Sequence, residues 1–161
     1  MIEIRALSQN DAPACAAIHA QSFEAGWDAS SFEEYINPKN VALGAYDVNT
    51  DEAGTLIGFI LMGAVTDQTD IITIAITPAA RRRGIARQLV TAAESRAMAR
   101  GAALIFLEAA EDNQSAIALY KSCGYIPIGS RKNYYRRAGG RVSALTMQKR
   151  LKAKEITNKS D

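Results

Sequence analysis

The sequence predicts a single α/β domain in which a mixed, mostly antiparallel and twisted central sheet is flanked by helices. The chain has 161 residues, the length of one ordinary domain, and 48% hydrophobic residues, enough for a sizeable core. β-rich runs come first, and strand-like and helix-like segments then alternate. We expect the domain to cover residues 1–148, and the basic segment 149–161, which lacks a periodic apolar face, to form a disordered tail.

The N-terminal segment predicts one strand and two helices. Residues 2–6 alternate between apolar and polar side chains, which is typical of a strand. Ser8 followed by Asp11 is typical of a helix start, and apolar side chains then recur at helical spacing. Asp28 is placed to cap a second, short helix that ends before Pro38.

β-rich runs dominate the middle of the chain, at residues 41–46, 55–65 and 71–76. Polar, turn-forming residues separate them at 49–52 and at 67–70. Three consecutive strands joined by short turns predict an antiparallel meander.

The pattern then changes from strand-like to helix-like. Apolar side chains fall at helical offsets over residues 84–100, and a glycine follows where a helix commonly ends. Residues 103–108 predict a buried strand, and Asn113 is placed to cap a further helix that also ends at a glycine. Two last strands near 125–130 and 142–149 complete the expected domain.

The charge is unevenly distributed along the chain. Residues 1–80 hold 2 Lys or Arg and 11 Asp or Glu, net −9, whereas residues 81–161 hold 17 and 6, net +11. The basic half is compatible with nucleic acid, with a phosphorylated cofactor opposite an acidic half that attracts a cationic substrate, or with charges scattered over the surface.

Composition also argues against several classes of protein. No nearly uncharged run approaches the roughly 20 residues that cross a bilayer, and the N-terminus lacks a signal-peptide pattern, so we expect a cytoplasmic protein with no membrane partner. Cys15 and Cys123 have no ligand-spaced Cys or His, which predicts neither a disulfide framework nor a metal site.

A strand, a tight turn and a helix start follow one another over residues 74–87, in the order Ile74-Ala75-Ile76-Thr77-Pro78-Ala79-Ala80-Arg81-Arg82-Arg83-Gly84-Ile85-Ala86-Arg87. The first N–H groups of a helix have no partner within it, so such a turn suits a pyrophosphate. Gly84 and Ala86 permit close approach, and four arginines add positive charge. The glycine patterns of nucleoside triphosphate and NAD sites are absent. Taken alone, the pattern also fits a basic turn before an ordinary surface helix.

This turn, R-x-x-G-x-A, resembles the [QR]-x-x-G-x-[GA] turn of the GCN5-related N-acetyltransferase (GNAT) superfamily. Residues 113–125 are similar to a second signature of that superfamily, N-x-x-A-x-x-L-Y-x-x-x-G-[FY]. Residues 23–27, 131–135 and 140–147 further resemble its RimI-type branch, which acetylates the N-terminal alanine of a small-subunit ribosomal protein. The resemblance covers nearly the whole chain through Met147.

The resemblance implies a GNAT-like fold with acetyl-CoA bound at the strand–turn–helix near residues 74–87. It implies that Glu108 is the general base and that Tyr120 is the general acid that protonates the departing thiolate. The cofactor contacts that it implies are Ile74, Ala75, Ile76, Arg82, Arg83, Gly84, Ile85, Ala86, Arg87 and Asn113.

These residue types suit the chemistry of acetyl transfer. An α-amino group with a pKa of about 8 is mostly protonated at pH 7, and a carboxylate can take its proton directly or through water. A thiolate leaving group with a pKa of about 8.5 gains from a phenol donor. Alternatives remain for each residue: Glu108 as a salt-bridged or capping carboxylate, Tyr120 as a core aromatic, and Asn113 as a plain N-cap.

Three aromatic residues, Trp27, Tyr134 and Tyr135, are candidates for substrate binding. They suit a peptide-binding wall, in which the tyrosines lie in a loop, or they belong to the core. The chain departs from the RimI-type branch between residues 136 and 143, where a proline and acidic residues are usual and Arg136, Val142 and Ser143 stand instead.

We therefore expect an acetyl-CoA-dependent enzyme that transfers acetyl directly to a primary amine, with the N-terminal alanine of a ribosomal protein as the first candidate. Two alternatives stay open: the same fold acting on a small amine such as a polyamine, amino acid or aminoglycoside, and a non-catalytic CoA-binding module. Neither a metal nor a nucleic-acid partner is expected.

Overall fold

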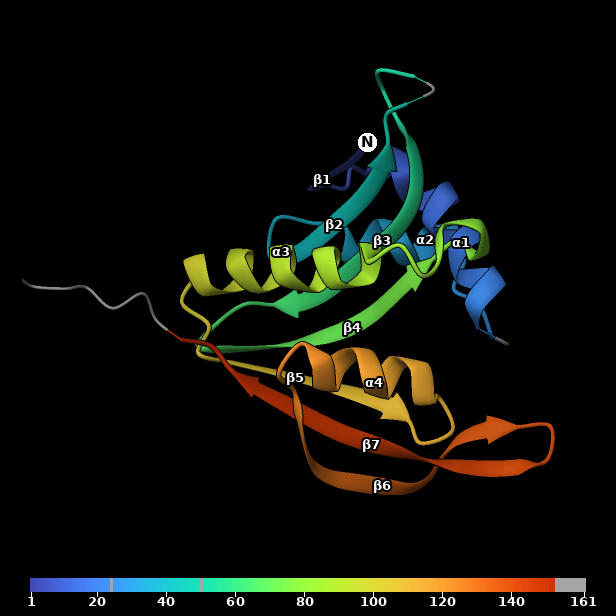
Figure 1. Ribbon diagram of the computed structural model, residues 1–161, viewed down its shortest axis with the longest axis vertical. Helices are drawn as coiled ribbons and strands as arrows, with labels where there is room; N and C mark the ends of the chain where they lie inside the picture. The colour runs from blue at the N-terminus through green and yellow to red at the C-terminus, as the bar shows by residue number, and fades with distance from the viewer. Residues whose placement is uncertain (24, 50, 153–161) are drawn as a thin grey trace, which may run out of the picture.

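The computed structural model describes residues 1–23, 25–49 and 51–152. Its central feature is a seven-stranded sheet with the strand order β1-β2-β3-β4-β5-β7-β6 (Figure 1). Neighbouring strands are antiparallel except for β4 and β5, which are parallel. The strands are β1 Ile2–Ala6, β2 Asn40–Asp47, β3 Thr55–Ala64, β4 Gln68–Ile76, β5 Leu104–Ala110, β6 Ile126–Arg137 and β7 Gly140–Arg150. This confirms the expected mixed, mostly antiparallel sheet.

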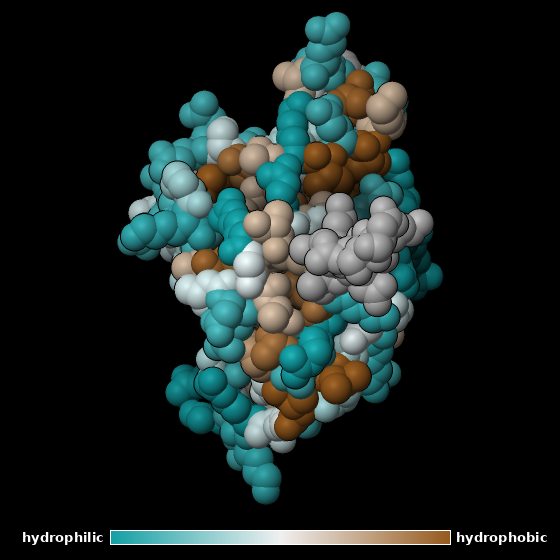
Figure 2. Space-filling view, turned by 90° about the vertical axis from the view of Figure 1, so that its left-hand side faces the viewer, coloured by the Kyte–Doolittle hydropathy of each residue, from teal (hydrophilic) through white to brown (hydrophobic). Residues whose placement is uncertain are grey.

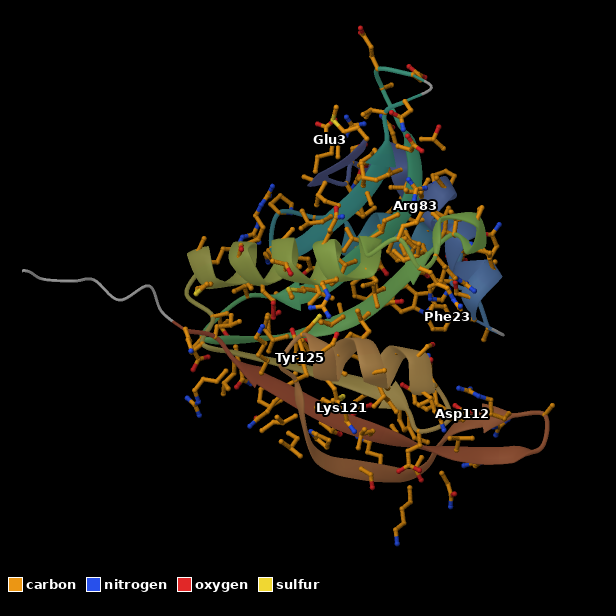
Figure 3. All side chains as sticks on the ribbon, in the orientation of Figure 1. Glu3, Phe23, Arg83, Asp112, Lys121 and Tyr125 are labelled. Atoms are coloured by element: carbon orange, nitrogen blue, oxygen red, sulfur yellow. The ribbon has the colours of Figure 1, made fainter. Side chains whose placement is uncertain are left out.

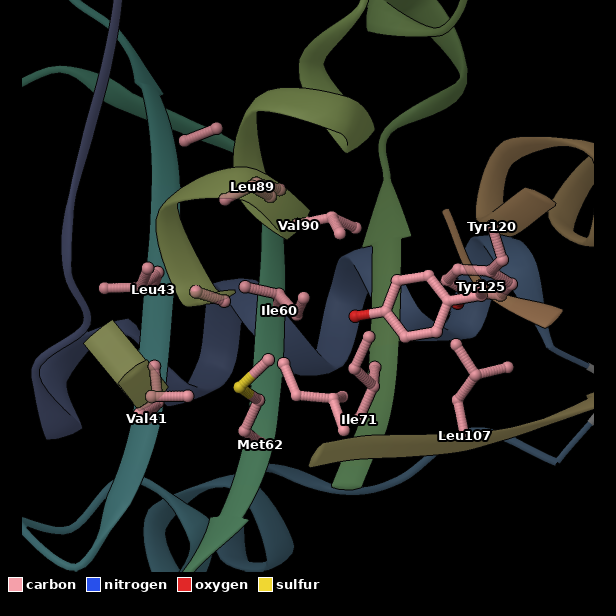
Figure 4. Packing of buried hydrophobic residues seen from close by; sticks show 14 of the residues in the cluster. Val41, Leu43, Ile60, Met62, Ile71, Leu89, Val90, Leu107, Tyr120 and Tyr125 are labelled. Carbon is pink, nitrogen blue, oxygen red and sulfur yellow. The ribbon is translucent and has the colours of Figure 1, made fainter. Parts of the chain in front are cut away.

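Helices cover both faces of the sheet. The helices are α1 Ala12–Ser22, α2 Ala29–Tyr35, α3 Ile85–Ala99 and α4 Gln114–Ser122. One buried cluster joins Leu89 and Val90 of α3 to Ile60 and Met62 of β3 and also includes Tyr120 of α4 (Figure 4). A second cluster joins α1 and α2 to the other face of β3. The sheet therefore has two apolar faces, each buried by its own pair of helices.

Local capping explains why the helices begin and end where they do. Asp28 Oδ1 accepts the N–H of Ser31 at 2.9 Å, and Asn113 Oδ1 accepts that of Ala116 at 3.2 Å. At the end of α3, Gly101 has a φ of 102°. Such caps satisfy backbone groups that have no partner inside the helix. The expected limits of α2, α3 and α4 are confirmed to within about two residues, whereas Gln9–Asp11, expected to open the first helix, form a 3-10 turn before α1.

β4 and β5 pair over only part of their length. The last register pair is Ile71 with Leu107, although β4 continues to Ile76 and β5 to Ala110. Next to this point the register between β4 and β3 shifts by one residue: Thr73 pairs with Leu61 and Ile71 with Met62. Ile72 is therefore an extra, bulged residue on β4. A bulge bends the strand that carries it. The two strands diverge beyond it near the middle of the sheet (Figure 1).

Three expectations about strand limits are wrong. Gln68–Asp70, expected as a turn, open β4 because they pair with β5. Tyr134 and Tyr135, expected in a loop, belong to β6, which pairs with β7 as far as Arg137. Arg150, expected in the tail after a strand that ends at Lys149, lies in β7. The remainder of that expected tail, from residue 153, lies outside the described residues. Gln68–Asp70 and Arg150 pair with residues that are distant in sequence, whereas Tyr134 and Tyr135 belong to a local hairpin in which Tyr135 pairs with Val142.

The surface on the left-hand side of Figure 1 is mainly hydrophilic, and hydrophobic residues emerge there in separate patches (Figure 2). Among the helices of the described residues, none is long and apolar enough to span a membrane.

Candidate active site

A cleft of about 390 Å³ opens where β4 and β5 diverge. Its walls come from β4, β5, α4, β6 and the end of α1. Five residues predicted from the sequence line it, namely Ile74, Glu108, Asn113, Tyr120 and Tyr135. A second cavity of about 400 Å³ lies between the α2–β2 turn and the end of α3, and no predicted site residue lines it.

Glu108 lies on β5, beside the point where the pairing with β4 ends. Its Oε1 forms an ion pair with Arg131 Nε of β6 at a distance of 2.9 Å. The Glu108 side chain is 26% exposed. The salt-bridged alternative for Glu108 is therefore observed. The same carboxylate also lines the cleft, so Arg131 holds it in position there.

Tyr120 lies on α4 across the cleft and is 5% exposed. Its ring meets that of Tyr125 edge to face at 5.9 Å, so it is a core aromatic and a cleft residue at once. Burial raises the pKa of the Tyr120 hydroxyl above its ordinary value, with a smaller contribution from Cys123. A phenol is protonated at neutral pH even at its ordinary pKa of about 10, so Tyr120 is a hydrogen-bond donor in the cleft.

The turn between β4 and α3 presents a cluster of backbone donors. Within the described part of the chain, the N–H groups of residues 82–87 have no backbone acceptor, and the first bond of α3 runs from Gln88 to Gly84. Arg82 and Gly84 both have left-handed backbones, with φ of 62° and 75°. Successive N–H groups in such a conformation form an anion-binding concavity.

The arginines of this turn are not equivalent. Arg82 and Arg83 are exposed. Arg81 instead donates to the Ile76 carbonyl and the Ser22 hydroxyl, at 3.2 and 3.0 Å. Arg87 donates to Ser122 Oγ at 2.6 Å and so ties α3 to the end of α4. Among the described residues neither Arg82 nor Arg83 has an acidic partner within 4.0 Å, so both cations remain available beside the N–H cluster.

The cofactor residues expected on β4 lie where its edge is unpaired. Ile74, Ala75 and Ile76 pair with β3 on one side, and the register with β5 has already ended on the other. Of the three, only Ile74 lines the cleft, and the Ala75 side chain packs in the α1–α2 cluster.

The three aromatic candidates are not brought together. Tyr135 lines the cleft. Burial raises the pKa of its hydroxyl, and the nearby Glu108 carboxylate adds a smaller increase. Tyr134 meets Tyr135 edge to face at 5.1 Å but is 52% exposed and does not line the cleft. The Trp27 ring stacks on Tyr35 at 5.1 Å, and the Trp27 backbone N–H donates to His19 Nδ1 at 3.1 Å. Trp27 therefore packs between α1 and α2, outside the cleft lining.

Phe23, Thr73 and Arg137 are among the cleft residues that sequence reasoning did not assign to the site. Arg137 stands two positions after Tyr135, a spacing that places both on one strand face once a strand is assumed. Asp112 holds its guanidinium through contacts of 3.0 and 3.3 Å. Figure 3 shows Phe23 and Asp112 at the same end of the diverging strands.

Thr73 follows the extra residue of β4, and its hydroxyl is the buried side-chain polar atom that lacks a partner among the described residues. No sequence pattern marks it, because its position depends on the bulge. Over the described ranges, no group of three or more His, Cys, Asp or Glu is placed to hold a metal.

Comparison with known proteins gives consistent matches. A sequence model of the acetyltransferase (GNAT) family matches residues 12–125. The chain is 34% identical over 155 residues to N-alpha-acetyltransferase RimI of Mycobacterium tuberculosis, covering 92% of each chain. It is 29% identical over 152 residues to the ribosomal protein bS18-alanine N-acetyltransferase of Escherichia coli, covering 91% of this chain and 96% of that one.

Solved structures agree with the sequence matches. The crystal structure of the ribosomal-protein-S18-alanine N-acetyltransferase of Escherichia coli has a TM-score of 0.85 at 25% identity, with 97% of this chain and 99% of that one covered. Arabidopsis thaliana NAA60 in complex with acetyl-CoA has a TM-score of 0.83 at 19% identity, with 94% and 99% covered, and shares the fold.

Proposed function

Because this chain belongs to the acetyltransferase (GNAT) family and is an N-acetyltransferase, we propose that it transfers acetyl from acetyl-CoA directly to a protein N-terminal α-amine. An N-terminal alanine of a ribosomal protein is the first candidate acceptor, because relatives act on one. The observation that carries the proposal is that Glu108 and Tyr120, from different elements, line one cleft at the divergence of β4 and β5.

The strand–turn–helix fits the cosubstrate. The N–H groups of residues 82–87 lack backbone acceptors, and the exposed Arg82 and Arg83 lie beside them, so this segment would hold the pyrophosphate. The unpaired edge of residues 74–76 would hold the pantetheine and acetyl part, with Asn113 beyond it. When bound, acetyl-CoA supplies the thioester that the amine attacks. The NAA60 structure, which shares the fold, is a complex with acetyl-CoA.

In the proposed reaction, Glu108 takes a proton from the acceptor amine, directly or through water. Its ion pair with Arg131 keeps the carboxylate at the cleft. The amine nitrogen forms the new bond to the acetyl carbon as the carbon–sulfur bond breaks. The Tyr120 hydroxyl gives its proton to the departing sulfur. Like any phenol it is protonated at neutral pH, and it can donate a hydrogen bond to the sulfur as negative charge develops there.

Direct transfer, without an acetylated residue of the chain, agrees with the placement of the cysteines. Burial raises the pKa of Cys15 to about 12, and Cys123 is not among the cleft residues. Since the thiolate is the nucleophilic form, a buried thiol with such a pKa is inert.

The test is CoA release from acetyl-CoA with three acceptors: a peptide with a free N-terminal alanine, the same peptide with a blocked N-terminus, and spermidine. We expect turnover of the free peptide only. Glu108→Gln is expected to lower kcat by roughly 10²-fold or more, because a positioned base contributes that much.

The matched control is Glu111→Gln, because Glu111 is an exposed acid directly after the end of β5 that does not line the cleft. It should keep the rate. If spermidine is the one acceptor that is turned over, the acceptor class is a small amine and not a peptide N-terminus. If the Glu108→Gln variant binds acetyl-CoA and turns over at the same rate as the unchanged chain, Glu108 is not the general base.

A further inference from the structure

A buried threonine of the cleft carries a polar atom that the proposed reaction does not use. Thr73 of β4 lines the cleft and is 8% exposed. Among the described residues, its hydroxyl oxygen is the buried side-chain polar atom without a hydrogen-bond partner. Because such a hydroxyl costs free energy, a group that enters the cleft is the natural candidate to satisfy it.

The strand neighbours of Thr73 show which face of the sheet its side chain occupies. Thr73 pairs with Leu61 of β3, and the side chains of directly paired residues lie on one face. Leu61 and Ala75 both pack in the cluster that includes α1 and α2. Ile74 packs in the cluster that includes α3 and α4. Since side chains alternate along a strand, Thr73 lies on the α1–α2 face.

Glu108 lies on the same face. Its neighbours on β5, Leu107 and Ala109, both pack in the cluster of α3 and α4, so the side chain between them points to the opposite face. The parallel register ends with Ile71 and Leu107, which places Glu108 one residue and Thr73 two residues beyond the last pair. The carboxylate and the hydroxyl therefore stand on diverging strands, on one side of the sheet.

The general acid of the proposed reaction lies on the other face, because Tyr120 packs in the cluster of α3 and α4. The thiolate therefore departs on that side, and the amine approaches from the side of Glu108. The end of α1, which contributes Ser22 and Phe23 to the cleft, is also on the side of Glu108. Thr73 is thus placed to meet the acceptor amine.

We propose that the Thr73 hydroxyl binds the acceptor amine and orients it towards the acetyl carbon. Glu108 removes one proton from the ammonium group, and the Thr73 oxygen accepts a hydrogen bond from a second N–H, which leaves the lone pair free to attack. Rotation about the Cα–Cβ bond exchanges the hydroxyl and methyl positions of threonine, so the oxygen can turn to the amine without a change in the backbone. The inference rests on the proposed function and adds a residue to the same site.

Thr73→Val tests the inference, because it removes the hydroxyl and nearly keeps the shape. With the free N-terminal alanine peptide and saturating acetyl-CoA, we expect kcat/KM for the peptide to fall roughly tenfold, as the loss of one hydrogen bond provides. KM for acetyl-CoA should not change. The midpoint of urea unfolding should stay the same or rise, because a buried polar atom without a partner is removed. Thr73→Ser keeps the hydroxyl and should retain most of the rate.

Thr69→Val is the matched control from the same strand. Thr69 is also buried, but its hydroxyl donates to the Gly63 carbonyl at 3.0 Å, and it does not line the cleft. Its replacement should lower the midpoint of urea unfolding and leave kcat/KM for the peptide unchanged. The two variants therefore have opposite effects on stability and on activity.

An unchanged kcat/KM in Thr73→Val would overturn the inference and leave the transferase standing. Equal losses in Thr73→Val and Thr73→Ser would also overturn it, because the hydroxyl would then not be the cause. A higher KM for acetyl-CoA with unchanged peptide kinetics would assign Thr73 to the cosubstrate instead. If the unchanged chain does not turn over the free peptide, the proposed function fails and the inference fails with it.

Discussion

His19 fixes the segment between α1 and α2 through its neutral form. Its Nδ1 accepts the backbone N–H of Trp27 at 3.1 Å, and its ring stacks on Phe23 at 4.2 Å. Burial lowers the pKa of His19 below its ordinary value. Phe23, a cleft residue, therefore depends on a histidine that must stay unprotonated.

Because of this histidine, we expect the free energy of unfolding to decrease as the pH is lowered. The unfolded chain binds the His19 proton more readily than the folded chain, so the free energy of unfolding falls as pH drops through the ordinary histidine range, about 6.5. His19→Asn keeps an acceptor near the Nδ1 position but does not titrate. Urea unfolding between pH 7 and pH 5 should show a shallower loss of stability in this variant, and parallel curves would contradict the prediction.

Among the elements, the turn between β4 and α3 depends on its backbone conformation. Gly84 has a φ of 75°, and a Cβ built there would meet nothing within 4 Å. Gly84→Ala therefore meets conformational strain without a clash, and should cost about 1 kcal/mol in free energy of unfolding. Relief of that strain would turn the N–H groups of residues 82–87, so KM for acetyl-CoA should rise several-fold.

Gly101→Ala is the control for this change. Gly101 also has a positive φ, 102°, with open space around it, but it lies at the opposite end of α3. Its replacement should cost similar stability and leave KM for acetyl-CoA unchanged. A KM that rises equally in both variants would mean that the effect comes from α3 as a whole.

The same elements show which features a sequence can predict. Asp28, Asn113 and Gly101 act on backbone groups a few residues away, so the helix limits could be predicted locally. Glu108 and Tyr120 were expected from the resemblance to the GNAT superfamily, and they do share the cleft. The lengths of β4 and β6 depend on partner strands, so the contact of Arg131 with Glu108 and the place of Thr73 could not be predicted.

At the scale of the whole molecule, the divergence that opens the cleft also weakens the sheet. β4 and β5 share only the register pairs from Gln68–Leu104 to Ile71–Leu107. Glu94 of α3, a helix that packs on β2, β3 and β4, helps to join the two sides. Its carboxylate accepts the Tyr125 hydroxyl at 3.2 Å and pairs with Lys149 of β7 at 2.9 Å.

Glu94→Leu should therefore destabilise the whole fold. It leaves a half-buried ammonium and a buried hydroxyl without partners, and should cost about 2–3 kcal/mol in free energy of unfolding, measured in urea. Adding Lys149→Met removes the unpaired charge and should recover part of the loss. A double variant no more stable than Glu94→Leu would show that Glu94 acts through α3 packing alone, and that the two sides of the sheet are held together without this bridge.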